Sequence, residues 1–398
     1  MSDALFLIKT IADLTSKVGS GITPKGGSNI YTRNGPKLIR SQNIHPGRLN
    51  LTDAVCIPEE IHQSMNTTRV EGGDVLLNIT GASIGRCAIA PFDIGEANVN
   101  QHVCIIRSEP GEIDSSFLMH YLNSYGGQVQ INRFQAGGNR EGLNFAQIRS
   151  MEIPCPPLPE QKKIAEILSG IDMAIESQRL AIDKVSATHR IACQQKISDL
   201  SRSSEMATIG SISNKIMDYR GKSPPKHETG VPLITAKNIR KGFIDINPAE
   251  FIQEDLYEEW MTKGIPSPGD ILVTTEAPLG NVAIAPSSKF AIGQRVICIS
   301  PTRAMITPEY LLACMKTDDF QGQLTASSTG STVSGVRQGV LLDCNIPLPE
   351  IEWQRRIGNF DLNASKLINA LTAKKAKLAI LKQSLALDLL SGRKRVSV

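Results

Sequence analysis

Apolar side chains recur at alternating steps of four and three residues from Glu160 to Leu200, and polar residues separate them. This stretch contains no proline and a single glycine, Gly170. A spacing that averages 3.5 residues predicts one long helix whose apolar stripe packs against another helix. At about 1.5 Å per residue this helix would be roughly 60 Å long, which is too long for one small globular core. The stripe consists of Ile164, Leu168, Ile171, Ile175, Ile182, Val185 and Ala192.

A second stretch, from Ile346 to Leu390, repeats the first in order. Each stretch opens with prolines, which suit the start of a helix and not its interior. Gln161-Lys162-Lys163-Ile164 recurs as Gln354-Arg355-Arg356-Ile357, and a second apolar stripe runs through Ala364, Leu371, Leu378 and Leu385. Two unrelated surface helices would also show apolar stripes. The shared order of prolines, basic pair and stripe favours a duplication.

The segments between the helices repeat as well. The correspondence runs in chain order, which indicates a chain built as globular unit, long helix, globular unit, long helix. The matched pairs are 21–24 with 221–224, 36–44 with 231–239, 73–77 with 269–273, and 84–91 with 279–286.

Within each globular unit, short β-rich runs alternate with turn residues, and one longer apolar run has helical spacing. The pattern predicts strands at 75–79, 87–89, 271–274 and 282–284, and helices at 116–124 and 308–316. Residues 3–15 fit a short helix or an edge strand. We therefore predict an α+β protein with two similar mixed α/β domains, at residues 1–157 and 205–349. Two long helices, within 158–204 and 350–398, would separate the domains and form an antiparallel coiled coil with pseudo-two-fold symmetry.

Composition and charge narrow the class of protein only slightly. The 398 residues carry a net charge of +4, which permits a polyanionic partner without requiring one. No apolar run is long enough to span a membrane, and the first residues lack the pattern of a signal peptide. The eight cysteines form no CxxC pair and the six histidines do not cluster beside them, which indicates reduced thiols in a cytoplasmic protein without a zinc site.

Common enzyme motifs are missing from the sequence. There is no GxGxxG, HExxH, GxSxG or Walker A sequence, so we predict no catalytic residues. Isolated acids such as Asp270 and Glu276 fit turns or surfaces. The glycine-rich stretches 134–140 and 327–332 fit flexible surface loops, or loops that approach a nucleic-acid backbone. A duplicated chain without these motifs favours a binding or scaffolding protein.

Two similar units on one chain can bind two related sites, such as the halves of a divided DNA sequence. Arg, Lys, Asn, Gln, Ser and Thr side chains read bases, and the predicted loops are rich in them. Arg40 corresponds to Thr235, so the two units would present different groups. The predicted DNA-binding residues are Thr23, Lys25, Arg40, Gln42, Asn43, Asn78, Thr80, Asn139, Arg140, Lys222, Thr235, Lys237, Asn238, Thr274, Thr275 and Thr329.

Residues 156–168 (PPLPEQKKIAEIL), the closing LLSGRKRV at 389–396 and the GITP element at 21–24 resemble the DNA specificity subunits of type I restriction–modification systems. The resemblance covers essentially the whole chain. Trp353 stands where Glu160 does in the first copy, and Glu350 where Pro157 does, which indicates divergence of the second copy.

The resemblance implies that each recognition domain reads one half of a bipartite double-stranded DNA target. The long helices would set the spacer and dock two methyltransferase subunits, and restriction subunits would join that core. S-adenosylmethionine, ATP and Mg²⁺ would be used by the partner subunits, with no cofactor or metal in this chain. The apolar stripes supply the predicted partner-binding residues Ile164, Leu168, Ile171, Ile175, Ile357, Leu371 and Leu378.

Two other functions are compatible with the residues alone. The chain could be a coiled-coil scaffold whose duplicated domains bind proteins, or a nuclease or methyltransferase that acts by itself. Selection of a bipartite DNA sequence would exclude the scaffold, and turnover by the purified chain would favour the enzyme.

Overall fold

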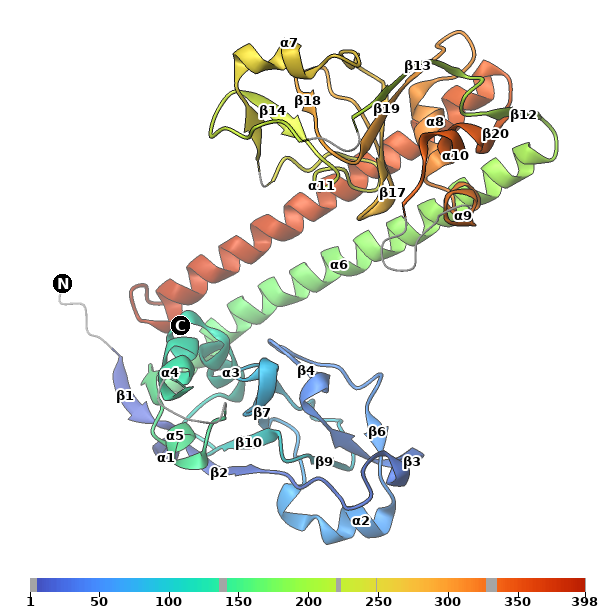
Figure 1. Ribbon diagram of the computed structural model, residues 1–398. Helices are drawn as coiled ribbons and strands as arrows, with labels where there is room; N and C mark the ends of the chain where they lie inside the picture. Colours follow the sequence, from blue (N-terminus) through green and yellow to red (C-terminus); the bar gives the residue numbers. More distant parts are fainter. Residues whose placement is uncertain (1–5, 136–141, 220–222, 248, 327–334, 398) are drawn as a thin grey trace. The chain divides into compact units, whose positions relative to one another are not determined.

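The structure, a computed structural model, describes residues 6–135, 142–219, 223–247, 249–326 and 335–397 (Figure 1). By its contacts the chain divides into two compact units, one of residues 1–179 with 374–398 and one of residues 180–373. No helix within the described ranges is long and apolar enough to cross a membrane.

The first unit is built on a four-stranded antiparallel sheet with the strand order β2-β10-β7-β8. A three-stranded sheet of order β6-β3-β9, in which β3 and β9 run parallel, lies in the same unit. Two short pairs, β1 with β11 and β4 with β5, complete its strands. The strands are β1 (Leu7–Thr10), β2 (Thr15–Ser20), β3 (Thr32–Ile39), β4 (Ile44–His45), β5 (Arg48–Leu49), β6 (Val55–Cys56), β7 (Val75–Asn78), β8 (Cys87–Ile89), β9 (Ala97–Val99), β10 (Val103–Ser108) and β11 (Glu152–Cys155). The helices are α1 (Ile11–Leu14), α2 (Glu59–Ser64), α3 (Ser115–Asn123), α4 (Tyr125–Gln135) and α5 (Phe145–Arg149), with 3₁₀ turns at Gly27–Ile30, Ser41–Asn43, Asn66–Thr68 and Gly81–Ser83.

The second unit repeats this topology. Its four-stranded sheet has the order β13-β19-β16-β17, its three-stranded sheet the order β15-β14-β18, and β12 pairs with β20. The β14–β18 pair is parallel, as β3–β9 is in the first unit. The strands are β12 (Glu205–Thr208), β13 (Ser213–Asp218), β14 (Val231–Ile234), β15 (Phe251–Ile252), β16 (Ile271–Thr275), β17 (Leu279–Ile284), β18 (Ala291–Ile292), β19 (Val296–Pro301) and β20 (Asn345–Leu348). The helices are α7 (Tyr257–Trp260), α8 (Pro308–Met315), α9 (Asp318–Ala326) and α10 (Gln338–Asp343), with a 3₁₀ turn at Glu254–Leu256.

The structure confirms the predicted α+β fold, and its elements follow the sequence pattern closely. Strands β7 and β16 are buried along their whole length, as expected for continuous apolar runs in the middle of a sheet. Residues 7–15 contain both of the predicted alternatives, because strand β1 runs directly into helix α1. The change occurs at Thr10, whose side chain and that of Asp13 cap the helix reciprocally.

The two predicted long helices are present as α6 (Leu158–Ser201) and α11 (Ile351–Leu390) (Figure 1). The 44 residues of α6 correspond to a length of about 66 Å. The predicted segments 158–204 and 350–398 contain these helices, whereas the contact-based units divide each helix between them. The reason lies in the cores of the units, since each core includes the first turns of one long helix and the last turns of the other.

Contacts within each unit show that the helices run antiparallel. In the first unit, Lys382 of α11 donates to both carboxylate oxygens of Asp172 of α6 at 2.6 Å. In the second unit, His189 Nε2 of α6 lies 3.1 Å from Asp361 Oδ1 of α11. Later positions in α6 thus meet earlier positions in α11, which confirms the predicted antiparallel pairing.

A buried glutamine holds the start of each long helix in its unit. Gln161 is 2% exposed; its Oε1 accepts from the N–H of Asp114 at 2.8 Å, and its Nε2 donates to the carbonyl of Pro156 at 2.9 Å. Gln354 is 1% exposed and makes the corresponding bonds, from the N–H of Thr307 and to the carbonyl of Pro349, each at 2.9 Å. The repeated glutamine is therefore a structural clamp on the segment before α3 or α8.

His120 of α3 lies buried against helix α6 in the first unit. Its Nε2 lies 2.9 Å from the Ser169 hydroxyl, and its Nδ1 lies 3.9 Å from Asp172. Burial, and secondarily the charge of Lys382, lower the pKa of His120 from 6.5 to about 3. The folded protein therefore keeps this imidazole neutral at pH values where the unfolded chain protonates it.

Replacement of either clamp glutamine should destabilise the protein. Gln161→Ala or Gln354→Ala leaves a part-buried N–H and a buried carbonyl without these bonds, and an unpaired buried group costs about 1–3 kcal/mol. Urea unfolding followed by circular dichroism measures the loss. The neighbouring exposed residues Lys162 and Arg355 provide matched controls, because their alanine variants should unfold close to the wild-type midpoint. Equal midpoints for Gln161→Ala and Lys162→Ala would contradict the clamp.

His120 should make stability depend on pH in mildly acidic solution. At pH values below 6.5, the usual pKa of histidine, His120 binds a proton in the unfolded chain but stays neutral in the folded protein. The free energy of unfolding therefore falls as the pH drops. One such proton gives a slope of up to about 1.4 kcal/mol per pH unit. Urea unfolding at pH 7 and pH 5 should show a smaller difference for His120→Gln than for the wild type. The exposed His227 serves as the control, and His227→Gln should retain the wild-type difference.

Candidate nucleic-acid interface

Three of the predicted DNA-binding segments converge in the first unit. The Asn78 Nδ2 at the end of β7 donates to the carbonyl of Ser41 at 2.9 Å, which joins the 40–43 turn to the central strand. The N–H of Gly21, the first residue of the GITP element, donates to the carbonyl of Asn100 at 3.1 Å. A side chain at Gly21 would place Cβ only 1.6 Å from the carbonyl oxygen of Val99, so the close approach requires glycine.

The same segments meet in the second unit through different bonds. The N–H of Asn281 donates to Thr274 Oγ1 at 2.9 Å, and the Asn281 Nδ2 donates to the carbonyl of Ile239 at 2.8 Å. The turn that begins at Thr235 is thereby joined to strand β16. Ser223 Oγ lies 3.1 Å from Gln294 Oε1, so Ser223, which matches Thr23 of the GITP element, lies beside the residues that lead into β19.

Five predicted DNA-binding side chains are buried inside these turns and strands. Asn43 Oδ1 accepts from the N–H of Arg40 at 3.0 Å, and Asn238 Oδ1 accepts from the N–H of Thr235 at 3.0 Å. The structure corrects the prediction for this group, because side chains that are at most 3% exposed shape the loops and offer no surface to a ligand. The group is Asn43, Asn78, Asn238, Thr274 and Thr275.

Other predicted residues do reach the surface. Lys25, Gln42 and Lys237 are exposed, while Thr23, Arg40, Thr80 and Thr235 are half-buried. The Arg40 guanidinium lies over the Tyr31 ring, 5.4 Å from its centre. Four of the predicted residues lie outside the described residues: Asn139, Arg140, Lys222 and Thr329.

Two buried polar atoms beside the 40–43 turn have no hydrogen-bond partner among the described residues. They are Arg40 Nε and Asn78 Oδ1. A buried unpaired polar atom costs free energy, and its presence often marks a place where a ligand or solvent completes the bonding. Because both atoms are buried, they do not by themselves assign the 40–43 turn to an interface.

A polar pair stands just beyond the central strand of each unit, and the sequence pattern predicted only Thr80 among their four residues. In the first unit, Thr80 Oγ1 lies 2.5 Å from His102 Nδ1. In the second unit, Arg295 Nε lies 3.0 Å from Glu276 Oε1. His102, Arg295 and Glu276 are absent from the predicted DNA-binding residues. A signal exists for two of them, because His102 directly follows Gln101 and Arg295 directly follows Gln294.

Three of the predicted partner-binding residues are covered by the chain itself. Ile164 and Leu168 are fully buried in the core of the first unit, and Ile357 is 3% exposed in the core of the second. The structure corrects this part of the prediction, because these side chains fix α6 and α11 to the recognition domains. Ile171, Ile175, Leu371 and Leu378 are half-buried.

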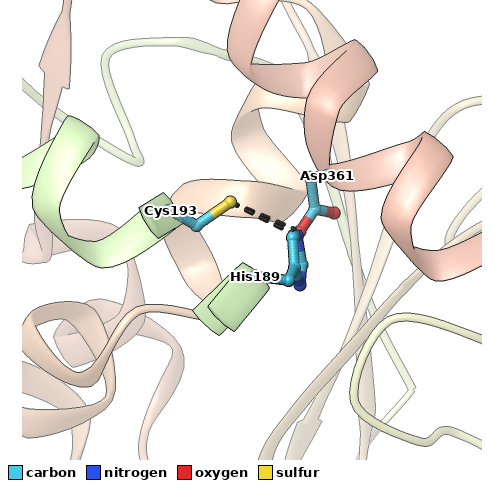
Figure 2. Close-up of side chains that lie close together, drawn as sticks. All are labelled: His189, Cys193 and Asp361. Atoms are coloured by element: carbon cyan, nitrogen blue, oxygen red, sulfur yellow. Dashed lines mark hydrogen bonds and ion pairs between the residues drawn. The ribbon is translucent and has the colours of Figure 1, made fainter. Parts of the chain in front are cut away.

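His189 and Cys193 of α6 approach Asp361 of α11 in the second unit (Figure 2). The Cys193 sulfur lies 3.4 Å from His189 Nε2 and 3.9 Å from Asp361 Oδ1. Such a set of donors could bind a transition metal. However, Lys316 Nζ already donates to both oxygens of Asp361, at 2.7 and 2.8 Å, and its charge would lie beside any bound cation.

The protonation states of Asp361 and Cys193 indicate a network in which the negative charge of Asp361 is balanced by Lys316. Burial alone would raise the pKa of Asp361, but the bond from His189 and the charge of Lys316 hold that pKa below its usual value. Burial, and secondarily the charge of Asp361, raise the pKa of the Cys193 thiol to about 12. The carboxylate is thus charged and paired with Lys316 while the thiol stays protonated, so we interpret the cluster as a polar contact between α6, α11 and the residue that follows α8.

Comparison with known proteins shows that both halves of the chain match one protein family. Residues 27–184 and 202–380 match the family described as type I restriction modification DNA specificity domain. The protein named MjaX specificity subunit, from Methanocaldococcus jannaschii, is 22% identical over 98% of this chain and 93% of its own length. The EcoKI specificity subunit of Escherichia coli K12 is 24% identical over 60% of this chain and 54% of its own length.

Solved structures show the same fold. The S subunit of a type I restriction–modification system from M. genitalium superposes with a TM-score of 0.66, at 15% identity, over 98% of this chain and 97% of its own. A chain from a study of the assembly and conformational transition of a type I system superposes with a TM-score of 0.54, at 17% identity, over 98% of this chain and 99% of its own. Two family matches, one in each half of the chain, agree with the internal repeat, and this chain belongs to the type I restriction–modification DNA specificity family.

Proposed function

We propose that the chain reads a bipartite double-stranded DNA sequence on behalf of a type I restriction–modification complex. Each recognition domain reads one half of the target, and the paired helices set the number of unread base pairs between the halves. The observation that carries this proposal is the repeat itself, in which one backbone topology occurs twice with different exposed side chains. Family membership favours DNA as the ligand over the alternative of a protein-binding scaffold.

The long helices supply surfaces for the partner subunits. Three large apolar side chains of α6 are mostly exposed, namely Met173 at 70%, Leu180 at 54% and Ile191 at 64%. On α11, Ile380 is 67% exposed and Leu367 is 49% exposed. Apolar side chains on the outside of paired helices suit the binding of further helices. We assign these positions, together with half-buried Ile171, Ile175, Leu371 and Leu378, to the docking of two methyltransferase subunits.

The chemistry of the complex is assigned to the partners. Specificity subunits of this family are non-catalytic recognition subunits. We propose that methyltransferase subunits use S-adenosylmethionine, that restriction subunits use ATP and Mg²⁺, and that the assembly works in the cytoplasm. The role of this chain is to bind the partners and to position them on the DNA.

Selection from a random DNA library should give a two-part sequence. The chain is assembled with its methyltransferase subunits, and bound fragments are sequenced. Exchange of residues 1–157 for the corresponding segment of a relative should change one half of the sequence and leave the other half and the gap as they were. Exchange of residues 205–349 is the matched control and should change the other half. Loss of selection in the wild-type assembly would contradict the proposal, and simultaneous change of both halves would contradict its modular form.

Lengthening both long helices should lengthen the gap between the halves. One heptad inserted after Arg179 in α6 and one after Ala373 in α11 keeps the two helices matched. Seven helical residues add about 10 Å. This equals about three base pairs at roughly 3.4 Å each. Library selection measures the gap. A heptad in α6 alone should instead prevent assembly, and an unchanged gap in the doubly extended chain would contradict the role of the helices.

A further inference from the structure

The polar pairs beyond the central strands lie on the same backbone framework in both units. The N–H of Ile79 donates to the carbonyl of His102 at 3.0 Å, and the N–H of Leu143 donates to the carbonyl of Ile79 at 2.9 Å. In the second unit, the N–H of Thr275 donates to the carbonyl of Arg295 at 3.0 Å. The N–H of Val336 donates to the carbonyl of Thr275, also at 3.0 Å.

The bridges beside these bonds confirm the correspondence. Thr80 bridges Gly142, and Glu276 bridges Gly335, each in antiparallel fashion. Position 80 therefore corresponds to position 276, and position 102 to position 295. At this one place in the framework, the first unit carries a hydroxyl and an imidazole and the second unit carries a carboxylate and a guanidinium.

The pair in the second unit is both accessible and held in place. The Arg295 side chain is 45% exposed and the Glu276 side chain is 38% exposed. Arg295 adopts a φ of +66°, a left-handed conformation that non-glycine residues rarely take. Such conformations persist only where the surroundings impose them, and they concentrate at functional sites. Glu276 Oε1 lies 3.0 Å from Nε of Arg295, and the two terminal nitrogens of Arg295 lie at the opposite end of the guanidinium group from Nε.

We propose that Arg295 reads a guanine in the second half of the target, and that His102 occupies the equivalent base-reading position for the first half. This inference rests on the proposed function, because a base-reading residue requires a DNA target. Arginine makes paired hydrogen bonds to O6 and N7 of guanine in the major groove. Glu276 acts as a positioning residue that fixes the plane of the guanidinium.

The pair in the first unit works with different donors and acceptors. Thr80 Oγ1 engages Nδ1 of His102, so the hydroxyl and the imidazole form one polar edge beyond β7. Gln101 Nε2 lies 3.4 Å from Nε2 of His102 and belongs to the same turn. Two chemically different pairs at one position of the framework allow two different half-sites to be read by one fold.

The test compares variants in the complete assembly with methyltransferase subunits, by library selection and by the rate of DNA methylation. Arg295→Ala should relax one base position in the second half only, and should lower discrimination at that position by about 5- to 150-fold. Arg295→Lys keeps the charge without the paired geometry and should relax the same position. Glu276→Gln should relax it less. His102→Ala should relax one position in the first half only.

Arg240 provides the matched control. Its guanidinium is 44% exposed and pairs with Asp245 at 3.3 Å, so it resembles Arg295 in charge and exposure. Arg240→Ala should leave the selected sequence unchanged. If Arg295→Ala and Arg295→Lys weakened binding equally on all DNA sequences, Arg295 would be assigned to phosphate contact and the inference would be overturned. An unchanged selected sequence in these variants would also overturn the inference. Failure of the wild-type assembly to select any bipartite sequence would instead overturn the proposed function.

Discussion

The structure depends on the anchoring of each long helix in the core of a recognition domain. Ile164 and Leu168 bury the first turns of α6 together with Leu389 and Leu390, the last turns of α11. Gln161 adds a part-buried hydrogen bond from the N–H of Asp114 and a buried one to the carbonyl of Pro156. Most helical stability in proteins comes from packing of an apolar face and not from helix propensity. Burial at the helix ends therefore leaves the intermediate turns free to present side chains outward.

The internal repeat distinguishes the side chains that maintain the shared backbone from the exposed side chains that differ between the two units. Polar side chains that are identical in the two units make the same backbone bonds. Gln128 donates to the carbonyls of Gly85 and Leu122, and its counterpart Gln321 donates to those of Gly280 and Met315. Where the units differ in exposed polar groups, as at Thr80 and Glu276, the backbone bonds stay the same. The duplicated chain thus keeps one framework and varies the surface that it carries.

Burial also decides which candidate residues belong to an interface. Asn43 and Asn238 have suitable chemistry for base recognition, but their amides are consumed in shaping the turns that follow β3 and β14. The same reasoning removes Ile164, Leu168 and Ile357 from the partner surface. The corrections have one physical cause, since a side chain that satisfies the interior of its own domain has no free surface for another molecule.

The sequence by itself determined the elements and their duplication. Periodic apolar spacing, proline placement and the repeated order of motifs predict α6, α11 and the central strands, because these signals are local and each acts over a few turns or strands. The tertiary structure alone decided which polar residues are exposed and which are paired. His102 and Arg295 are paired with Thr80 and Glu276, which lie just beyond β7 and β16, and Asp361 is paired with His189 of α6 and with Lys316 at the end of α8. Contacts between residues that are distant in the chain depend on strand register and helix packing, which no local pattern specifies.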